Sequence, residues 1–380
     1  MNSLFFQLIR VAIGTRDSLS RLPSQKEWKA LYDMAKKQSL VGVCFAALQR
    51  LGADADEGFA RIGMSEMLYL TWMGMTAKIQ QKNQTVDEQC VALQKRLSAD
   101  GLRSCILKGQ GVGQLYAEHL LGLRQSGDID IYVDCGMEKA LAYAREKFGD
   151  VEYDYINAHV HCYEDTEVEL HWRAQALTNV FANRRLQRWL KEHEEMLFGG
   201  KARLEVRGVD STGSPTDVLE IVTPSAEFNA FYILLHCYHH MFESGLGLRQ
   251  LMDYYFVLKA VGKEGKDCKE SVVALFEKFG MQKFASGIMW IMKEVFGLPE
   301  EMMLCEASEK EGGFLLEEVM QNGNFGHHDK RIKKVGSGKM SELWRNVQHN
   351  WHLASHYPAE LFWQPVWLVY HFCWKRFGNH

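Results

Sequence analysis

The most constraining feature of the sequence is the segment 128–134, Asp-Ile-Asp-Ile-Tyr-Val-Asp, in which aspartates alternate with apolar residues. Alternating side chains point to opposite faces of a β-strand, so the pattern predicts a strand whose apolar face covers a core. Asp128 and Asp130 then project from the same face, about 7 Å apart along the backbone. Aspartate is a poor strand former, and neighbouring carboxylates repel unless a cation lies between them. A Mg²⁺ ion would explain the pair, and a solvated face on an edge strand is the alternative.

Around this strand the sequence predicts a mixed α/β region. Short apolar runs and alternating segments indicate strands, whereas apolar residues at three- and four-residue spacing indicate helices. A polar turn between two alternating segments is typical of a hairpin. The expected elements are strands at 105–107 and 128–134, helices over 111–123 and 138–148, and a hairpin formed by 159–163 and 167–172.

The remainder of the chain favours helices. Apolar residues recur at helical spacing, and only six prolines are present to interrupt them. Thr223 followed by Pro224 is a typical helix start. We therefore expect an α+β protein, in which a mixed β-sheet core is flanked by mainly helical N- and C-terminal regions. The expected regions are an N-terminal helical region at 1–100, the core at 101–222, a C-terminal helical region at 223–329, and a basic, aromatic-rich tail at 330–380.

A third carboxylate is expected near the two aspartates. In the segment 167–172, alternation puts Glu167, Glu169 and His171 on one face. If this strand lies beside the first, Glu169 can meet Asp128 and Asp130, and three carboxylates can hold two metal ions for nucleotidyl or phosphoryl transfer. Glu167 is nearer the turn and is expected to be a solvated charge. His171 is expected to be a core histidine with a satisfied hydrogen bond, or else a residue behind the metal ligands.

Lys108, Gly109 and Gln110 form a turn between a predicted strand and a predicted helix. Glycine lets backbone amides approach a phosphate, and lysine adds a positive charge. An ordinary strand-to-helix turn is the alternative interpretation. The glycines at 109, 111 and 113 do not complete the dinucleotide-binding pattern, and the P-loop pattern is not present.

These residues, taken in order, resemble a bacterial uncharacterised nucleotidyltransferase family of the DNA-polymerase-β-like superfamily. The resemblance rests on residues 107–109, Tyr116, Arg124, the Asp-x-Asp of 128–130 and the Glu-x-His-Trp of 169–172, with weaker similarity at Asp253 and 323–326. It implies a mixed sheet flanked by helices and transfer of NMP from an NTP, such as ATP, to an acceptor with release of pyrophosphate. It also implies a two-metal Mg²⁺ site at Asp128, Asp130 and Glu169.

The same resemblance suggests which groups hold the triphosphate. Lys108, Gly109, Gln110 and Arg124 are the candidates, although a salt bridge to a nearby acid is the simpler role for Arg124. The superfamily usually has Gly-Ser or Gly-Gly before its aspartates, and Gln110 follows Gly109 here. We therefore keep two alternatives: a non-catalytic nucleotide-binding or scaffold protein that retains the fold, and a surface-associated module that acts through its tail.

Three further motifs are interpreted as structural. His236 and His240 share a helix face and could bind a metal ion, but their aromatic surroundings favour packing. Arg249 and Asp253 have the spacing of a pair on a helix surface. His328-Asp329 resembles the metal-dependent phosphohydrolase motif, but no later aspartate completes it.

Charge and composition restrict the partners. The formal net charge is −4, so the chain is not expected to coat nucleic acid. The nine cysteines include no C-x-x-C pair, and Arg10 interrupts the apolar N-terminus, so we expect a cytoplasmic protein with reduced thiols. The longest apolar stretch, 361–374, is too short to cross a membrane. The tail combines basic and aromatic residues, which favours docking on the body of the protein, with contact to nucleic acid or to a membrane surface as the alternatives.

Overall fold

A computed structural model describes residues 1–53, 58–206, 217–243, 245–323 and 352–377. Its centre is a mixed five-stranded sheet with the strand order β1-β2-β5-β4-β3. β2 and β5 are parallel, and the other neighbours are antiparallel. This confirms the α+β prediction. The strands are β1 (Ser104–Ile106), β2 (Ile129–Val133), β3 (Glu152–Tyr153), β4 (Asn157–Val160) and β5 (Val168–His171).

The register of β2 against β5 determines which side chains meet. Asp130 is directly opposite Glu169, and Ile131 is opposite Leu170. Because alternate residues share a face, the carboxylates lie on one side of the sheet and the aliphatic side chains lie on the other. β2 is an interior strand that is buried along its whole length, so the edge-strand interpretation of the aspartates is wrong.

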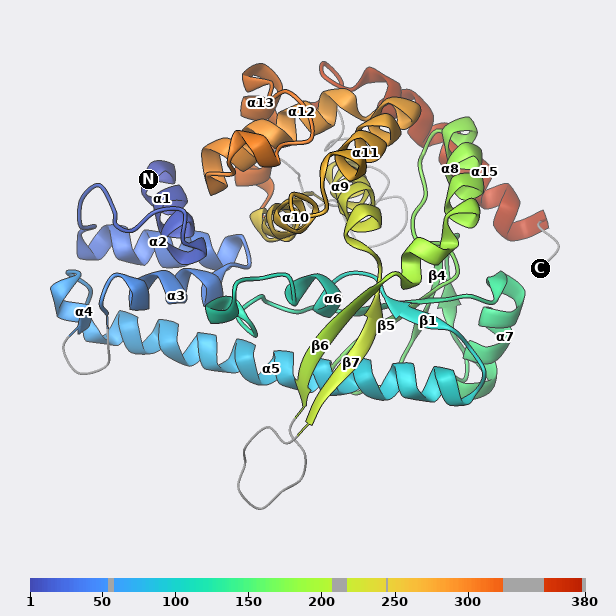
Figure 1. Ribbon diagram of the computed structural model, residues 1–380, viewed down its shortest axis with the longest axis horizontal. Helices are drawn as coiled ribbons and strands as arrows, with labels where there is room; N and C mark the ends of the chain where they lie inside the picture. Colours follow the sequence, from blue (N-terminus) through green and yellow to red (C-terminus); the bar gives the residue numbers. More distant parts are fainter. Residues whose placement is uncertain (54–57, 207–216, 244, 324–351, 378–380) are drawn as a thin grey trace, which may run out of the picture.

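A long helix supports the sheet from one side. α5 (Glu66–Ala99) runs below the N-terminal helices at one end and contacts β1 of the sheet, and a separate hairpin crosses it (Figure 1). The hairpin consists of β6 (Gly200–Val206) and β7 (Asp217–Thr223). Aliphatic side chains of α5, the sheet and α7 (Gly136–Phe148) share one core, which fixes β2 from behind.

A second, larger core joins the two helical regions. α1 (Asn2–Ile13), α2 (Gln25–Lys37) and α3 (Val41–Arg50) pack in one hydrophobic cluster with the C-terminal helices, while the short α4 (Gly58–Arg61) contacts α5. α1 contacts the π-helical turn η3 (Met292–Phe296). The C-terminal helices are α9 (Ala226–Glu243), α10 (Leu248–Val261), α11 (Lys266–Phe279), α12 (Gln282–Ile291) and α13 (Glu309–Asn322).

Two helices lie at the edge of the molecule opposite α1. α8 (Val180–Glu192) and α15 (Pro358–Phe377) contact each other and appear together at the right of Figure 1. The aromatic ring of Tyr155 packs against Trp367 and Trp374, so α15 docks on the core. In the part of the chain that the structure describes, no helix is long and apolar enough to cross a bilayer. His328 and Asp329 lie outside the described residues.

The helix predicted over 111–123 is wrong. Only α6 (Gln110–Gly113) and the 3-10 turn η1 (Glu118–Leu120) form there. Glycine destabilises helix interiors, and this stretch contains several, including Gly122 at φ +74°. The hairpin prediction is confirmed, because β4 pairs antiparallel with β5, although β4 begins two residues earlier than expected. A further 3-10 turn, η2 (Glu194–Phe198), precedes β6, and another, η4 (Glu300–Met302), follows η3.

Candidate functional site

Two carboxylates and an imidazole converge at the β2–β5 pair. His171 Nε2 lies 3.0 Å from Asp130 Oδ1 and 3.1 Å from Glu169 Oε2. One ligand atom from each residue can be chosen so that all three lie within 4.8 Å of one another, which is a spacing that could hold a metal ion. The direct register of Asp130 with Glu169 brings these groups together.

Lys108 follows β1 and reaches the same carboxylate. Its Nζ lies 2.7 Å from Asp130 Oδ1, and the Asp130 side chain is only 2% exposed. Burial by itself would lower the pKa of Lys108, but the carboxylates of Asp130 and Glu169 hold that pKa above its usual value. The ammonium group is therefore a permanent positive charge at the site.

His171 and Glu169 stabilise the charged forms of one another. Burial would lower the pKa of His171, but its contacts with Asp130 and Glu169 raise that pKa to about 9. Burial would raise the pKa of Glu169, but the contact with His171 and the charge of Lys108 lower it to about 2. The Glu169 carboxylate is thus ionised and His171 carries a proton at neutral pH, so His171 is a partner of both carboxylates rather than an isolated core histidine.

Asn157 also holds Glu169, and the sequence analysis did not identify it. Its Nδ2 donates to Glu169 Oε2 over 2.7 Å. Asn157 begins β4 and shares a face with His159, which is the register partner of Glu169. The alternation of Asn157 with His159 could have indicated that both side chains lie on the site face, but the predicted strand began at residue 159 and left Asn157 out. Glu167 is half-exposed and pairs with His159 over 2.8 Å, as expected for a charge near the turn.

A cavity of about 310 Å³ brings most of the predicted residues together. Asp128, Asp130, Glu169, Lys108 and Gly109 all line it. Within the described chain, the Asp128 carboxylate forms no hydrogen bond or ion pair, so it is available to a ligand in this cavity. Gly109 has φ +52° and ψ −110°, a conformation that L side chains rarely adopt.

Arg124 also lines the cavity, but its guanidinium group is held by an acid. Nε and Nη2 donate to the two oxygens of Asp253 over 2.7 and 2.8 Å, and Tyr116 donates to Oδ1 over 2.8 Å. Arg249 and Asp253 do not lie on the helix surface as predicted, because both residues are buried, and Arg249 also donates to the carbonyl of Gln125. Burial and the charge of Arg124 lower the pKa of Arg249 to about 10.

The Gln110 side chain points away from this cavity. It donates to Asp87 of α5 and accepts from Ser126 Oγ over 2.8 Å. The structure therefore does not bring the Gln110 side chain to the phosphate-binding position that the sequence suggested. Asp87 carried no sequence signal, since it is one of many polar residues in a long helix.

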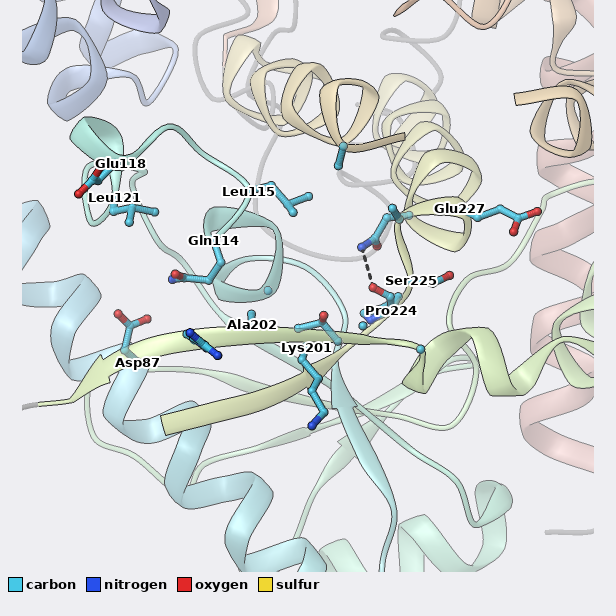
Figure 2. Close-up of a pocket in the computed structure, with 18 of the residues that line it drawn as sticks. Asp87, Gln114, Leu115, Glu118, Leu121, Lys201, Ala202, Pro224, Ser225 and Glu227 are labelled. Atoms are coloured by element: carbon cyan, nitrogen blue, oxygen red, sulfur yellow. Dashed lines mark hydrogen bonds between the residues drawn. The ribbon is translucent and has the colours of Figure 1, made fainter. Parts of the chain in front are cut away.

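Asp87 belongs to a second cavity of about 1290 Å³, behind α6. Figure 2 shows Asp87, Gln114 and Glu118 on one side of it and Pro224, Ser225 and Glu227 on the other. Gly109 lines the first cavity and Gly111 lines the second, so α6 forms part of the wall between them. A substitution at Asp87 can thus alter the position of the Gly109 turn, because Gln110 connects the two.

The ionisation of Asp87 gives a testable pH dependence. Burial raises its pKa to about 7, above the unfolded value near 4. The folded protein then binds more protons than the unfolded chain, so this group lowers the stability as pH rises from about 4 to 7. We expect Asp87→Asn to gain about 1–3 kcal/mol relative to wild type over that range, with no further gain above it. Urea unfolding at several pH values measures this.

The matched control for Asp87 is Asp33→Asn on the exposed surface of α2. The free energy of unfolding of this variant should stay within about 1 kcal/mol of wild type at each pH, because exposed ion pairs contribute little to stability. A constant difference for Asp87→Asn would show that the Asp87 carboxyl titrates normally.

Three histidines of α9 also line the first cavity. His240 Nε2 lies 3.0 Å from His236 Nε2, and both side chains have a lowered pKa because they are buried near other positive charges. His239 pairs with Glu243 instead. Among the described residues, the only metal-compatible group of three is Asp130, Glu169 and His171, so the packing interpretation of His236 and His240 is retained.

A match to a protein family gives independent information on the function of this site. Residues 24–297 match the model of an uncharacterised nucleotidyltransferase family. The chain belongs to this family. No curated protein and no solved structure matches the chain. The match includes the sheet, α5, α9, α10 and the whole site, so the family supports nucleotidyl transfer as the general function of the chain.

Proposed function

We propose that this chain is a Mg²⁺-dependent nucleotidyltransferase that transfers NMP from an NTP to a hydroxyl acceptor. The observation that carries the proposal is the convergence of Asp130 and Glu169, from two parallel strands, in a cavity that Asp128 and Lys108 also line. Carboxylates from neighbouring strands are the ligands that metal-dependent nucleotidyl transfer requires. Asp128, Asp130 and Glu169 are the proposed ligands of a two-metal site.

The donor atoms fit a hard divalent cation. Asp128 offers a carboxylate that forms no hydrogen bond or ion pair with a described residue, and Asp130 and Glu169 offer oxygens whose charge is balanced by Lys108 and His171. Oxygen ligands favour Mg²⁺ over softer metal ions. Bound Mg²⁺ would supply Lewis-acid stabilisation of phosphate oxygens and would lower the pKa of the acceptor hydroxyl.

The chain's own residues orient the reactants. Lys108 holds a fixed positive charge beside the carboxylates and is suited to a phosphate oxygen, while the Gly109 turn leaves room for the triphosphate. Asn157 and His171 keep Glu169 in position. Arg124 contributes to the cavity wall, with Asp253 fixing its orientation.

The reaction is an in-line displacement. The acceptor oxygen forms a bond to the α-phosphorus, the bond from that phosphorus to the pyrophosphate group breaks, and the acceptor proton passes to solvent. The acceptor is a hydroxyl compound, and the net charge of −4 disfavours a nucleic acid. Nine cysteines without paired spacing suit a cytoplasmic protein.

Nucleotide binding tests the proposal before the acceptor is known. We expect a non-hydrolysable NTP to raise the melting temperature only when Mg²⁺ is present, and a panel of the four bases identifies the preferred donor. Asp128→Asn should remove this shift without unfolding the protein, since the Asp128 carboxylate forms no hydrogen bond or ion pair with a described residue. The proposal would be refuted if none of the four nucleotides raised the melting temperature in the presence of Mg²⁺. Pyrophosphate release with candidate acceptors then separates a transferase from a nucleotide-binding scaffold.

A further inference from the structure

The outward face of α15 is apolar along its length. Its inner residues, including Trp367, His371 and Trp374, pack on the core. The outer residues follow the three- and four-residue spacing of one helix face, and Phe362, Val369 and Phe372 are each more than 60% exposed. The outward set is Phe362, Pro365, Val366, Val369, Phe372, Cys373 and Arg376. A helix face of this kind is unusual for a surface in contact with water alone.

The neighbouring helix α8 has an exposed basic face. Its exposed cations are Arg184, Arg185, Arg188 and Lys191, and none of them forms an ion pair with a described residue. These four cations on adjacent turns give a local positive potential despite the net charge of −4.

Aromatic rings connect the two faces. Phe181 of α8 is 62% exposed and packs against Trp363, which in turn packs against Phe362. α8 and α15 contact each other at the edge of the molecule (Figure 1). We call this surface the α8–α15 surface; it consists of Phe181, the four cations of α8 and the outward residues of α15.

We propose that the α8–α15 surface binds the anionic surface of a lipid bilayer. An apolar helix face flanked by Lys and Arg is the arrangement that inserts at the boundary between headgroups and acyl chains. The cations of α8 then contact anionic headgroups. A second copy of the chain is a poorer occupant, because a two-fold interface would place the same cations against each other. Nucleic acid would leave the apolar side chains of α15 uncovered.

This inference goes beyond nucleotidyl transfer and does not depend on it. α15 also touches the wall of the catalytic cavity: His371 Nε2 lies 2.5 Å from Asp154 Oδ1, and Asp154 lines that cavity. Binding through this surface would therefore hold the cavity close to the bilayer.

Vesicle flotation with the full chain tests the proposal. We expect binding to vesicles of equal phosphatidylcholine and phosphatidylglycerol, and much weaker binding to phosphatidylcholine alone. A triple variant, Phe362→Ser with Val369→Ser and Phe372→Ser, should lower the partition coefficient by about tenfold or more. Arg184→Glu with Arg188→Glu should lower it by a similar factor, and added salt should weaken wild-type binding.

The matched control is Met67→Ser with Leu70→Ser, which removes two exposed apolar side chains from α5. It should bind vesicles like wild type. Failure of the wild-type protein to bind anionic vesicles would overturn the proposal, as would equal binding by the triple variant. Concentration-dependent dimers that the triple variant abolishes would show that a second copy covers the surface. Capture of RNA that only the arginine variant loses would show a nucleic-acid site instead. None of these results bears on Mg²⁺-dependent NTP binding, so the two proposals can fail separately.

Discussion

Asp130→Asn is expected to reduce nucleotidyl transfer by about a thousandfold or more. The Asp130 carboxylate contacts both Lys108 and His171, and Asp130 is the register partner of Glu169. Asparagine keeps the size of the side chain but removes its charge, so the affinity for a divalent cation falls. Pyrophosphate release measures the effect once an acceptor is found. Until then, the measurement is the Mg²⁺-dependent rise in melting temperature with NTP, which the variant should lose.

The control for Asp130 is Glu167→Gln. Glu167 precedes the strand that carries Glu169, but its side chain is half-exposed and pairs with His159. This variant should bind Mg²⁺ and NTP like wild type. Circular dichroism must show that Asp130→Asn remains folded, because the substitution leaves Lys108 without its closest carboxylate. Wild-type binding by a folded Asp130→Asn variant would exclude Asp130 as a ligand.

Arg124→Met is expected to lower the free energy of unfolding by about 3–5 kcal/mol. The guanidinium group and Asp253 form a bidentate pair in which both residues are at most 9% exposed. Removal of the arginine leaves the buried Asp253 carboxylate without its bidentate partner, with the hydrogen bond from Tyr116 and the charge of the nearby Arg249 remaining. Urea denaturation followed by tryptophan fluorescence measures the loss.

Lys29→Met is the matched control for Arg124. It breaks an exposed pair with Asp33 on α2 and should change the stability by less than about 1 kcal/mol. A small loss of stability for Arg124→Met, combined with loss of NTP binding, would instead assign Arg124 a direct contact with the triphosphate.

The part of the site that depends on local pattern could be predicted from the sequence. Alternation alone indicated the strands that carry Asp130 and Glu169, and β-strand geometry then required each pair of alternate residues to share a face. Long-range partners could not be predicted in this way. Arg124 meets Asp253 across 129 residues, and no local spacing specifies that pair. The partner of Gln110 could not be predicted either, because Asp87 lies in a helix whose packing is determined by the whole core.

Contacts between the N-terminal segment and η3 have a consequence for synthesis on the ribosome. Arg10 donates to the carbonyls of Lys293 and Val295, and Thr15 donates to that of Phe296. These partners are translated more than 280 residues after α1. The apolar side of α1 therefore emerges long before its permanent neighbours exist, and the nascent chain must shield it in another way until η3 leaves the exit tunnel.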